Sequence, residues 1–182
     1  EIVTNASPSA NHEGSLATSL LLLPLLAKLT QAGERVAVID YAGNLYPPAL
    51  KGVVLEKLVL IRPRRRSDAL WAFQQCARSP ALALTWAGLP RLDQHQARTL
   101  SLAAEAGGGV CVALRRRGEG AAGAALRLKV NPAPARSWHE ASAKLELLRS
   151  KPAVRREALE LRLFEGRTSG QSPNTQTQRG WA

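Results

Sequence analysis

The 182-residue chain contains no methionine and only 4% aromatic residues, and its 25 lysines and arginines far outnumber its 14 acidic residues. The resulting net charge of +11 exceeds what a stable fold requires, and repulsion among like charges makes it slightly destabilising. A polyanionic partner is the simplest explanation of this excess. The scarcity of aromatic rings argues against extensive base stacking, on which proteins that bind single-stranded nucleic acid usually depend.

Long apolar runs are also absent. The longest, over 20–27, is too short to cross a bilayer and contains Pro24. A secretion signal is not expected, because Glu1 and Glu13 precede this run and no lysine or arginine does. We therefore expect no membrane partner and a cytoplasmic location, with nucleoid association. Since the chain does not begin with methionine, we also expect that the full-length protein has a preceding segment.

The chain has two cysteines and three histidines, all far apart in the sequence. Cys76 and Cys111 show neither CxxC spacing nor a neighbouring histidine cluster, which excludes a zinc motif of known spacing. Both lie in apolar periodic segments, so we expect reduced thiols in the core. No metal and no other cofactor is expected.

Short β-type runs alternate with helix-type stretches up to about residue 121, a pattern typical of a parallel sheet covered by helices. The predicted strands are 1–5, 35–40, 57–61, 81–86 and 109–114, and the predicted helices are 16–32, 67–79 and 93–106. Ser67 is expected to cap the second helix, and Trp71 within it is expected to face the core.

After Gly123 the pattern changes to three strands without a long helix between them, over 125–131, 143–149 and 157–164. The predicted fold class is therefore α/β, with a mostly parallel central sheet flanked by helices and extended by C-terminal antiparallel strands. We expect one domain over 1–166, made of an α/β part (1–121) and the strand extension (122–166). The polar segment 167–182 is expected to be a disordered tail.

The order of these elements resembles the core of the RecA recombinases from Glu1 to Arg167. The resemblance rests on RVAVID (35–40), NLYPPAL (44–50) and the strand pair KLELLRSKPAVRREALELRLFEG (144–166). Within that superfamily, LYPPAL, LVLIRPRRRSDALWAFQQCARS and LPRLD followed by LSLAAEAGGG are most similar to ImuA, the RecA-like family of bacterial mutasome cassettes. The resemblance implies a RecA-like fold and a role in translesion DNA synthesis.

A RecA-like fold implies a phosphate-binding loop, GxxxxGK[ST], in which glycines admit the phosphates, lysine neutralises them and the hydroxyl holds magnesium. In the corresponding stretch NHEGSLAT, Asn11 and Leu16 replace the glycines and Ala17 replaces the lysine. Only Thr18 is retained. The side chain of Leu16 would crowd the loop where its backbone must wrap the phosphate.

Two other positions of the resemblance agree with this loss. Thr85 or Trp86 stands where a magnesium-orienting acid is expected, and Ala42 stands where the recombinase has its water-activating glutamate. We expect Trp86 to end its strand and fill the vacated nucleotide pocket. Asp40 and Glu13 have neither a paired acid nor an activated nucleophile, so we expect no enzymatic activity.

Basic residues gather in three clusters, each at the end of a predicted strand or in the loop beyond it. They are Arg62, Arg64, Arg65 and Arg66; Arg115, Arg116 and Arg117; and Arg149, Lys151, Arg155 and Arg156. The first two clusters should lie at the carboxyl edge of the sheet, where open α/β sheets bind ligands. By the resemblance, 115–117 corresponds to the second DNA-binding loop of the recombinase, and 149–151 to the hairpin turn that reaches the neighbouring subunit's nucleotide. For any one cluster, a merely solvated charged surface is the alternative.

The leading hypothesis is a catalytically silent accessory protein that binds DNA nonspecifically and contacts RecA or mutasome polymerase subunits. DNA binding should weaken steeply with salt, because each neutralised phosphate releases counterions. The alternative is an inhibitor of cell division like SulA, in which the arginines face an acidic protein surface. A cryptic ATPase with an altered loop is a weaker alternative. The oligomeric state stays open, a homo-oligomer included, although a RecA-like filament is not expected.

Overall fold

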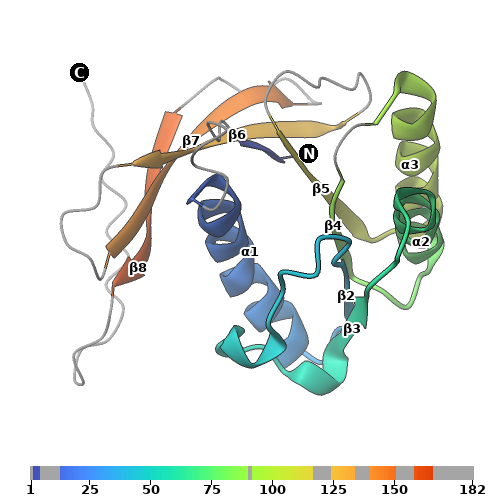
Figure 1. Cartoon of the computed structure of the whole chain (residues 1–182), viewed down its shortest axis with the longest axis horizontal. Coiled ribbons are helices and arrows are strands. Elements are labelled where there is room, and N and C mark those ends of the chain that lie inside the picture. The colour runs from blue at the N-terminus through green and yellow to red at the C-terminus, as the bar shows by residue number, and fades with distance from the viewer. Residues whose placement is uncertain are drawn as a thin grey trace.

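The computed structural model describes residues 2–4, 13–89, 92–116, 124–133, 140–150 and 158–165. Its strands are β1 (Ile2–Thr4), β2 (Val36–Ile39), β3 (Leu58–Ile61), β4 (Leu84–Gly88), β5 (Val110–Arg116), β6 (Leu126–Ala133), β7 (Glu140–Ser150) and β8 (Ala158–Glu165). Its α-helices are α1 (Glu13–Gln31), α2 (Arg66–Arg78) and α3 (Gln94–Gly107), and two 3-10 turns are η1 (Pro47–Ala49) and η2 (Leu55–Lys57). The strands form one mixed sheet in the order β3-β2-β4-β5-β1-β6-β7-β8 (Figure 1).

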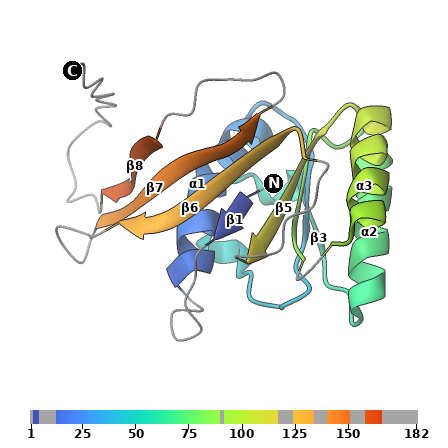
Figure 2. The same ribbon diagram turned by 90° about the horizontal axis from the view of Figure 1, so that it is seen from above.

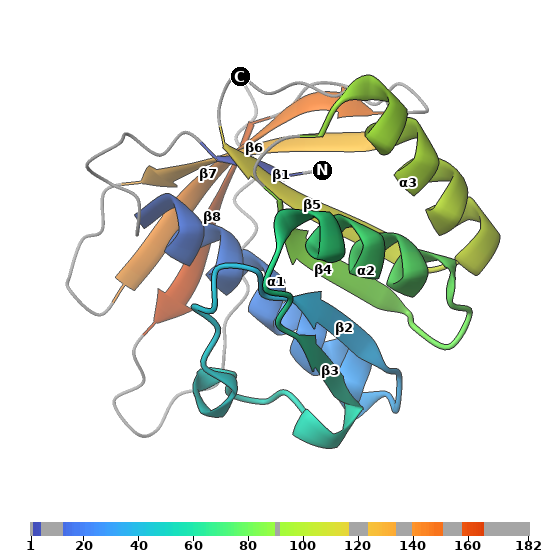
Figure 3. The same ribbon diagram turned by 45° about the vertical axis from the view of Figure 1, so that its right-hand side comes forward.

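Helices cover both faces of the parallel part of this sheet. Figure 3 shows α2 and α3 side by side across one face, while α1 lies against the other. The four residues of β2 are all buried, because a parallel strand covered on both faces directs apolar side chains into two cores. Figure 2 shows β6 and β7 extending the sheet away from α2 and α3.

The two cores follow the alternation of side chains along the strands. On the α1 face, Leu22 and Leu26 pack with Val38, Trp86 and other strand residues. On the opposite face, Phe73 of α2 and Leu100 of α3 belong to a cluster that includes Ile39 and Ala87.

A segment without an α-helix connects β2 to the parallel strand β3, and it passes beside α1 (Figure 1). The side-chain amide of Gln31 donates to the carbonyl of Gly52 at 2.7 Å, and the amide of Val54 donates to Oγ1 of Thr30 at 3.0 Å. These bonds attach the connection to the last turn of α1. The connection thereby covers the core beside α1, which a crossover helix would otherwise cover.

The predicted α/β class is confirmed, with one correction to the C-terminal strands. β6 is parallel to β1, with Ile2 opposite Leu128, because both strands start at the same edge of the sheet. Among the described strands, the antiparallel pairs are β6 with β7 and β7 with β8. The predicted tail over 167–182 lies outside the described residues.

Several element ends differ from the predictions. β4 was expected over 81–86 but spans Leu84–Gly88, because the amide of Leu82 bonds the carbonyl of Ser79 in a turn that keeps the preceding residues out of the sheet. The proposed cap at Ser67 is wrong, since α2 begins at Arg66 and the Ser67 hydroxyl bonds Asp68 instead. Asp93 does cap α3, in a reciprocal capping box with Gln96.

The glycines of AEAGGG have a packing role at the end of α3. A Cβ atom at Gly107 would lie 2.1 Å from the carbonyl oxygen of Ala77, so only glycine lets the ends of α2 and α3 approach this closely. Gly108 ends α3 in the left-handed region, with φ of 71°.

Truncating the buried leucine of α1 should destabilise the fold far more than truncating its neighbour. Leu26 is 1% exposed and Leu25 is 40% exposed. We expect Leu26→Ala to lower the free energy of unfolding by about 2–5 kcal/mol through lost burial and a residual cavity. Leu25→Ala makes the same chemical change in the same helix and should cost less than about 1 kcal/mol. Urea denaturation of both variants checks this, and equal losses would contradict the placement of α1.

Candidate nucleic-acid interface

The carboxyl ends of the parallel strands form one edge of the sheet, and two of the predicted basic clusters lie on it. Arg62, Arg64 and Arg65 follow the end of β3, and Arg115 and Arg116 end β5. β2 and β4 separate these two strands. With strands about 4.8 Å apart, the ends of β3 and β5 are about 14 Å from each other along the edge.

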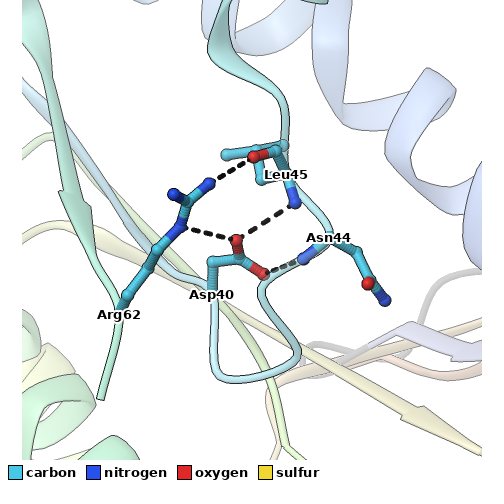
Figure 4. Close-up of polar contacts among 4 residues, drawn as sticks. All are labelled: Asp40, Asn44, Leu45 and Arg62. Atoms are coloured by element: carbon cyan, nitrogen blue, oxygen red, sulfur yellow. Dashed lines mark hydrogen bonds and ion pairs between the residues drawn. The ribbon is translucent and has the colours of Figure 1, made fainter. Parts of the chain in front are cut away.

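A buried carboxylate organises the loop that leaves β2 at this edge. Asp40 is 9% exposed. Its Oδ1 accepts the amide of Asn44 at 3.0 Å, and its Oδ2 accepts the amide of Leu45 at 3.0 Å and Nε of Arg62 at 3.2 Å (Figure 4). Arg62 also donates through Nη2 to the carbonyl oxygen of Leu45 (Figure 4). We call these four residues the Asp40 clamp.

The clamp changes the interpretation of Asp40 and Arg62, two residues that the sequence analysis singled out. Asp40 is neither a solvated residue nor a helix cap, because both of its oxygens accept hydrogen bonds from the loop or from Arg62. A carboxylate held in this way is poorly suited to act as a general base. The positive charge of Arg62 is largely compensated by Asp40, so Arg62 is a weaker candidate for a phosphate contact than Arg64 or Arg65.

Arg64 and Arg65 are exposed between β3 and α2. Arg66 is also exposed, but it is the first residue of α2 and not a loop residue. It lines a cavity of about 400 Å³ between the first turns of α2 and α3, with Ser67, Leu70, Asp93 and Gln96. Because Asp93 carries the opposite charge, this cavity is not a purely cationic site.

The second cluster begins inside the strand, because β5 is two residues longer at its end than the predicted strand 109–114. Arg115 and Arg116 are strand residues, with Val3 and Thr4 of β1 as their register partners. β5 continues past Leu114 because β1 pairs with its last residues. Arg117 lies outside the described residues.

Arg149, the described residue of the third cluster, lies at the opposite edge. Arg149 is in β7 opposite Arg127, near the start of β6, and Ser150 is opposite Leu126. Since β6 runs parallel to β1 and β5, its start marks the amino edge of the parallel strands. Lys151, Arg155 and Arg156 lie outside the described residues. The structure therefore separates Arg149 from the other two clusters.

The stretch compared with a phosphate-binding loop is largely helical. α1 begins at Glu13, three residues before the predicted start, so Leu16, Ala17 and Thr18 belong to its first turns. Glutamate, leucine and alanine all favour a helix, and Glu13 also suits the positive end of its dipole. Asn11 lies outside the described residues.

The residues expected at the end of β4 are inside the strand instead. Thr85 and Trp86 are 2% and 6% exposed, and Trp86 packs in the core on the α1 face. Within the described part of the chain, Nε1 of Trp86 has no hydrogen-bond partner. Ala42, at the expected glutamate position, is exposed in the turn after Asp40.

Exposed aromatic side chains were missed by the sequence analysis. Tyr46 is 68% exposed and Tyr41 is 39% exposed, and both belong to the loop that the Asp40 clamp holds. Trp71 was expected in the core but is 63% exposed, because α2 buries the stripe that contains Ala69, Ala72 and Phe73. The signal for Tyr46 was its place before Pro47-Pro48, which ends the regular pattern.

The cysteines are free thiols that pack partly buried against the core of the α2 and α3 face. Burial raises the pKa of Cys76, and burial together with the neighbouring Cys76 raises the pKa of Cys111 to about 11. Within the described ranges, no group of three or more His, Cys, Asp or Glu side chains could hold a metal ion. No helix there is long and apolar enough to span a membrane.

No family model and no curated protein sequence matches this chain. Among solved structures, 127 chains are similar to it. One is the crystal structure of SulA from Pseudomonas aeruginosa, with 21% identity and a TM-score of 0.52 over 64% of this chain and 96% of that chain. The chain therefore has a SulA-like α/β fold.

Breaking the Asp40 clamp should loosen the loop at the carboxyl edge. Asp40→Asn removes the charge that three donors share, and we expect it to lower the free energy of unfolding by about 1.5–3 kcal/mol. Hydrogen exchange should also accelerate at the amides of Asn44 and Leu45. Asp68→Asn, which neutralises an exposed carboxylate on α2, is the control. Unchanged exchange at these two amides in Asp40→Asn would show that the clamp does not hold the loop.

The Cys111 thiol should make stability depend on pH in alkaline solution. Its pKa is about 11 in the fold against 9.0 as the ordinary value, so the unfolded chain loses this proton first. The contribution of the Cys111 thiol to the free energy of unfolding is therefore present below pH 9.0 and is lost as the pH rises towards about 11. The free energy of unfolding of the wild type should therefore fall more steeply over this interval than that of Cys111→Ala. Parallel curves for the two proteins would exclude this effect.

Proposed function

We propose that this chain is a non-catalytic accessory protein of DNA damage tolerance that binds DNA through the carboxyl edge of its sheet. The observation that carries the proposal is the position of two basic segments, Arg64–Arg65 after β3 and Arg115–Arg116 at the end of β5, on that one edge. Two cationic segments at strand ends about 14 Å apart suit a backbone that presents phosphates at regular intervals. Because phosphate contacts carry no sequence information, the binding is nonspecific.

Catalysis is not part of the proposed function. α1 already begins at Glu13, so the backbone before Thr18 is helical instead of forming a loop around a phosphate, and Asp40 is occupied by the clamp. An ATPase would need a lysine and an unoccupied carboxylate at these places. Detectable phosphate release that disappears in Thr18→Ala would favour the cryptic ATPase instead.

The resemblance to ImuA supplies the pathway, which is translesion synthesis within the SOS response. We propose RecA or mutasome polymerase subunits as protein partners, and a cytoplasmic location on the nucleoid. Pull-down with these proteins, with and without nuclease, separates a direct contact from one bridged by DNA.

A second candidate function is favoured by the SulA-like fold. In this case the chain is a protein-interaction inhibitor of cell division, and its arginines bind an acidic protein surface. The two candidates differ in whether the chain binds DNA at all.

Removing two arginines from the carboxyl edge should weaken DNA binding more than removing two from the amino edge. Arg64→Ala with Arg65→Ala is the test variant. Arg35→Ala with Arg78→Ala is the matched control, since these exposed residues precede β2 and end α2. In fluorescence anisotropy with a labelled duplex at several salt concentrations, the test variant should bind more weakly, and its log-log salt slope should shrink by about 1.8.

Two outcomes of this titration contradict the proposal in different ways. If the wild type binds neither this duplex nor a labelled single strand at low salt, DNA binding is wrong and the SulA-like candidate remains. If both double variants lose the same affinity, binding follows total charge and the carboxyl edge is not the site.

A further inference from the structure

Tyr46 presents an exposed aromatic ring from a backbone that is fixed on both sides. The amide and the carbonyl of the preceding residue, Leu45, are bonded to Asp40 and Arg62 respectively. The carbonyl of Tyr46 accepts the amide of Ala49 at 3.0 Å, and Pro47 restricts the following backbone. Because the backbone is already fixed, only the two side-chain torsions of Tyr46 lose freedom when its ring binds, which makes tyrosine an effective anchor.

The surroundings of this ring favour an anionic partner. The clamp pairs Asp40 with Arg62, so the arginine compensates the negative charge of the carboxylate that holds the loop. Exposed Arg64 and Arg65 follow Arg62 along the chain after Pro63. Asp68, in the first turn of α2, offsets only part of this positive charge.

Tyr41 lies on the same loop, next to the clamped Asp40, and its ring is partly exposed. The loop thus carries two aromatic side chains, and the clamp bonds it to Arg62, the first of the basic residues that follow β3. Stacking rings beside cationic groups are the combination with which proteins bind single-stranded nucleic acid.

We propose that the Tyr46 ring, supported by Tyr41, stacks against unpaired bases of single-stranded DNA whose phosphates contact Arg64 and Arg65. This inference rests on the proposed DNA binding and adds a preference for single strands. In a duplex the bases are stacked on each other, so Tyr46 contributes nothing there. An aromatic anchor for a protein partner would use the same ring, but the neighbouring arginines favour the polyanion.

The test compares Tyr46→Ala with Tyr46→Phe, using a labelled oligothymidine and a labelled duplex of equal length. Loss of one stacking ring should weaken oligothymidine binding roughly tenfold or more. Duplex affinity should change less than about twofold, and the salt slope should stay unchanged because no phosphate contact is lost. Tyr46→Phe keeps the ring and should bind oligothymidine like the wild type.

A second measurement locates the contact directly. An oligothymidine that contains 5-iododeoxyuridine should crosslink to Tyr46 under ultraviolet light, and peptide mass spectrometry should find the adduct on the loop over 41–46. A crosslink elsewhere, with none on this loop, would overturn the inference. Thermal unfolding of Tyr46→Ala checks that the variant is folded. If the variant has lost much of its stability, the crosslink to the wild type decides whether the inference holds.

The outcomes separate this inference from the proposed function. If the wild type binds neither oligothymidine nor duplex, the proposed function fails, and the inference fails with it. If the wild type binds both but Tyr46→Ala binds oligothymidine normally, only the inference is wrong. Equal weakening on both DNAs would indicate a structural role of Tyr46. Normal DNA binding with loss of pull-down by RecA or a polymerase subunit would assign the ring to a protein partner.

Discussion

β2 is a parallel strand that is buried on both faces, so its neighbouring polar residues can lie only at its ends. This constraint determines the arrangement of the helices and the loop around β2. All four of its residues are buried, so α1 must cover one face and α2 with α3 the other. The first polar side chain after the strand, Asp40, is still 91% buried and needs partners. The Asp40 clamp supplies them, and in doing so it sets the path of the loop and the position of Arg62. The candidate interface depends on this arrangement.

The same constraint explains why polar and basic residues gather at the carboxyl edge. Every parallel strand ends there, and loops and helix starts bring polar residues to the surface at that point. Where the resemblance places catalytic residues, the chain has helical residues at 16–18 and the exposed Ala42. This edge combines the basic residues that follow β3 and end β5 with the exposed aromatic rings of the loop after β2.

The periodic pattern predicted the strands and helices well, because apolar alternation and glycine stops are local signals. It also placed two basic clusters at the carboxyl edge, since strand direction follows from the alternating order of elements. Three features could not be read from local pattern. The parallel pairing of β6 depends on β1, which is far away in the sequence. The exposure of Trp71 depends on which stripe of α2 meets the sheet. The Asp40 clamp requires Arg62, whose distance from Asp40 in space is set by the pairing of β2 with β3.

The position of β1 has a consequence for how the molecule is made. Its residues pair on one side with Leu114–Arg116 of β5 and on the other with Leu128–Val130 of β6. When β1 leaves the ribosome, neither partner has been synthesised. β1 must therefore stay unpaired until β5 and β6 have emerged, and it then enters the sheet between these two later strands. Such non-local pairing is slow, so the closure of the sheet around β1 should be a late step of folding.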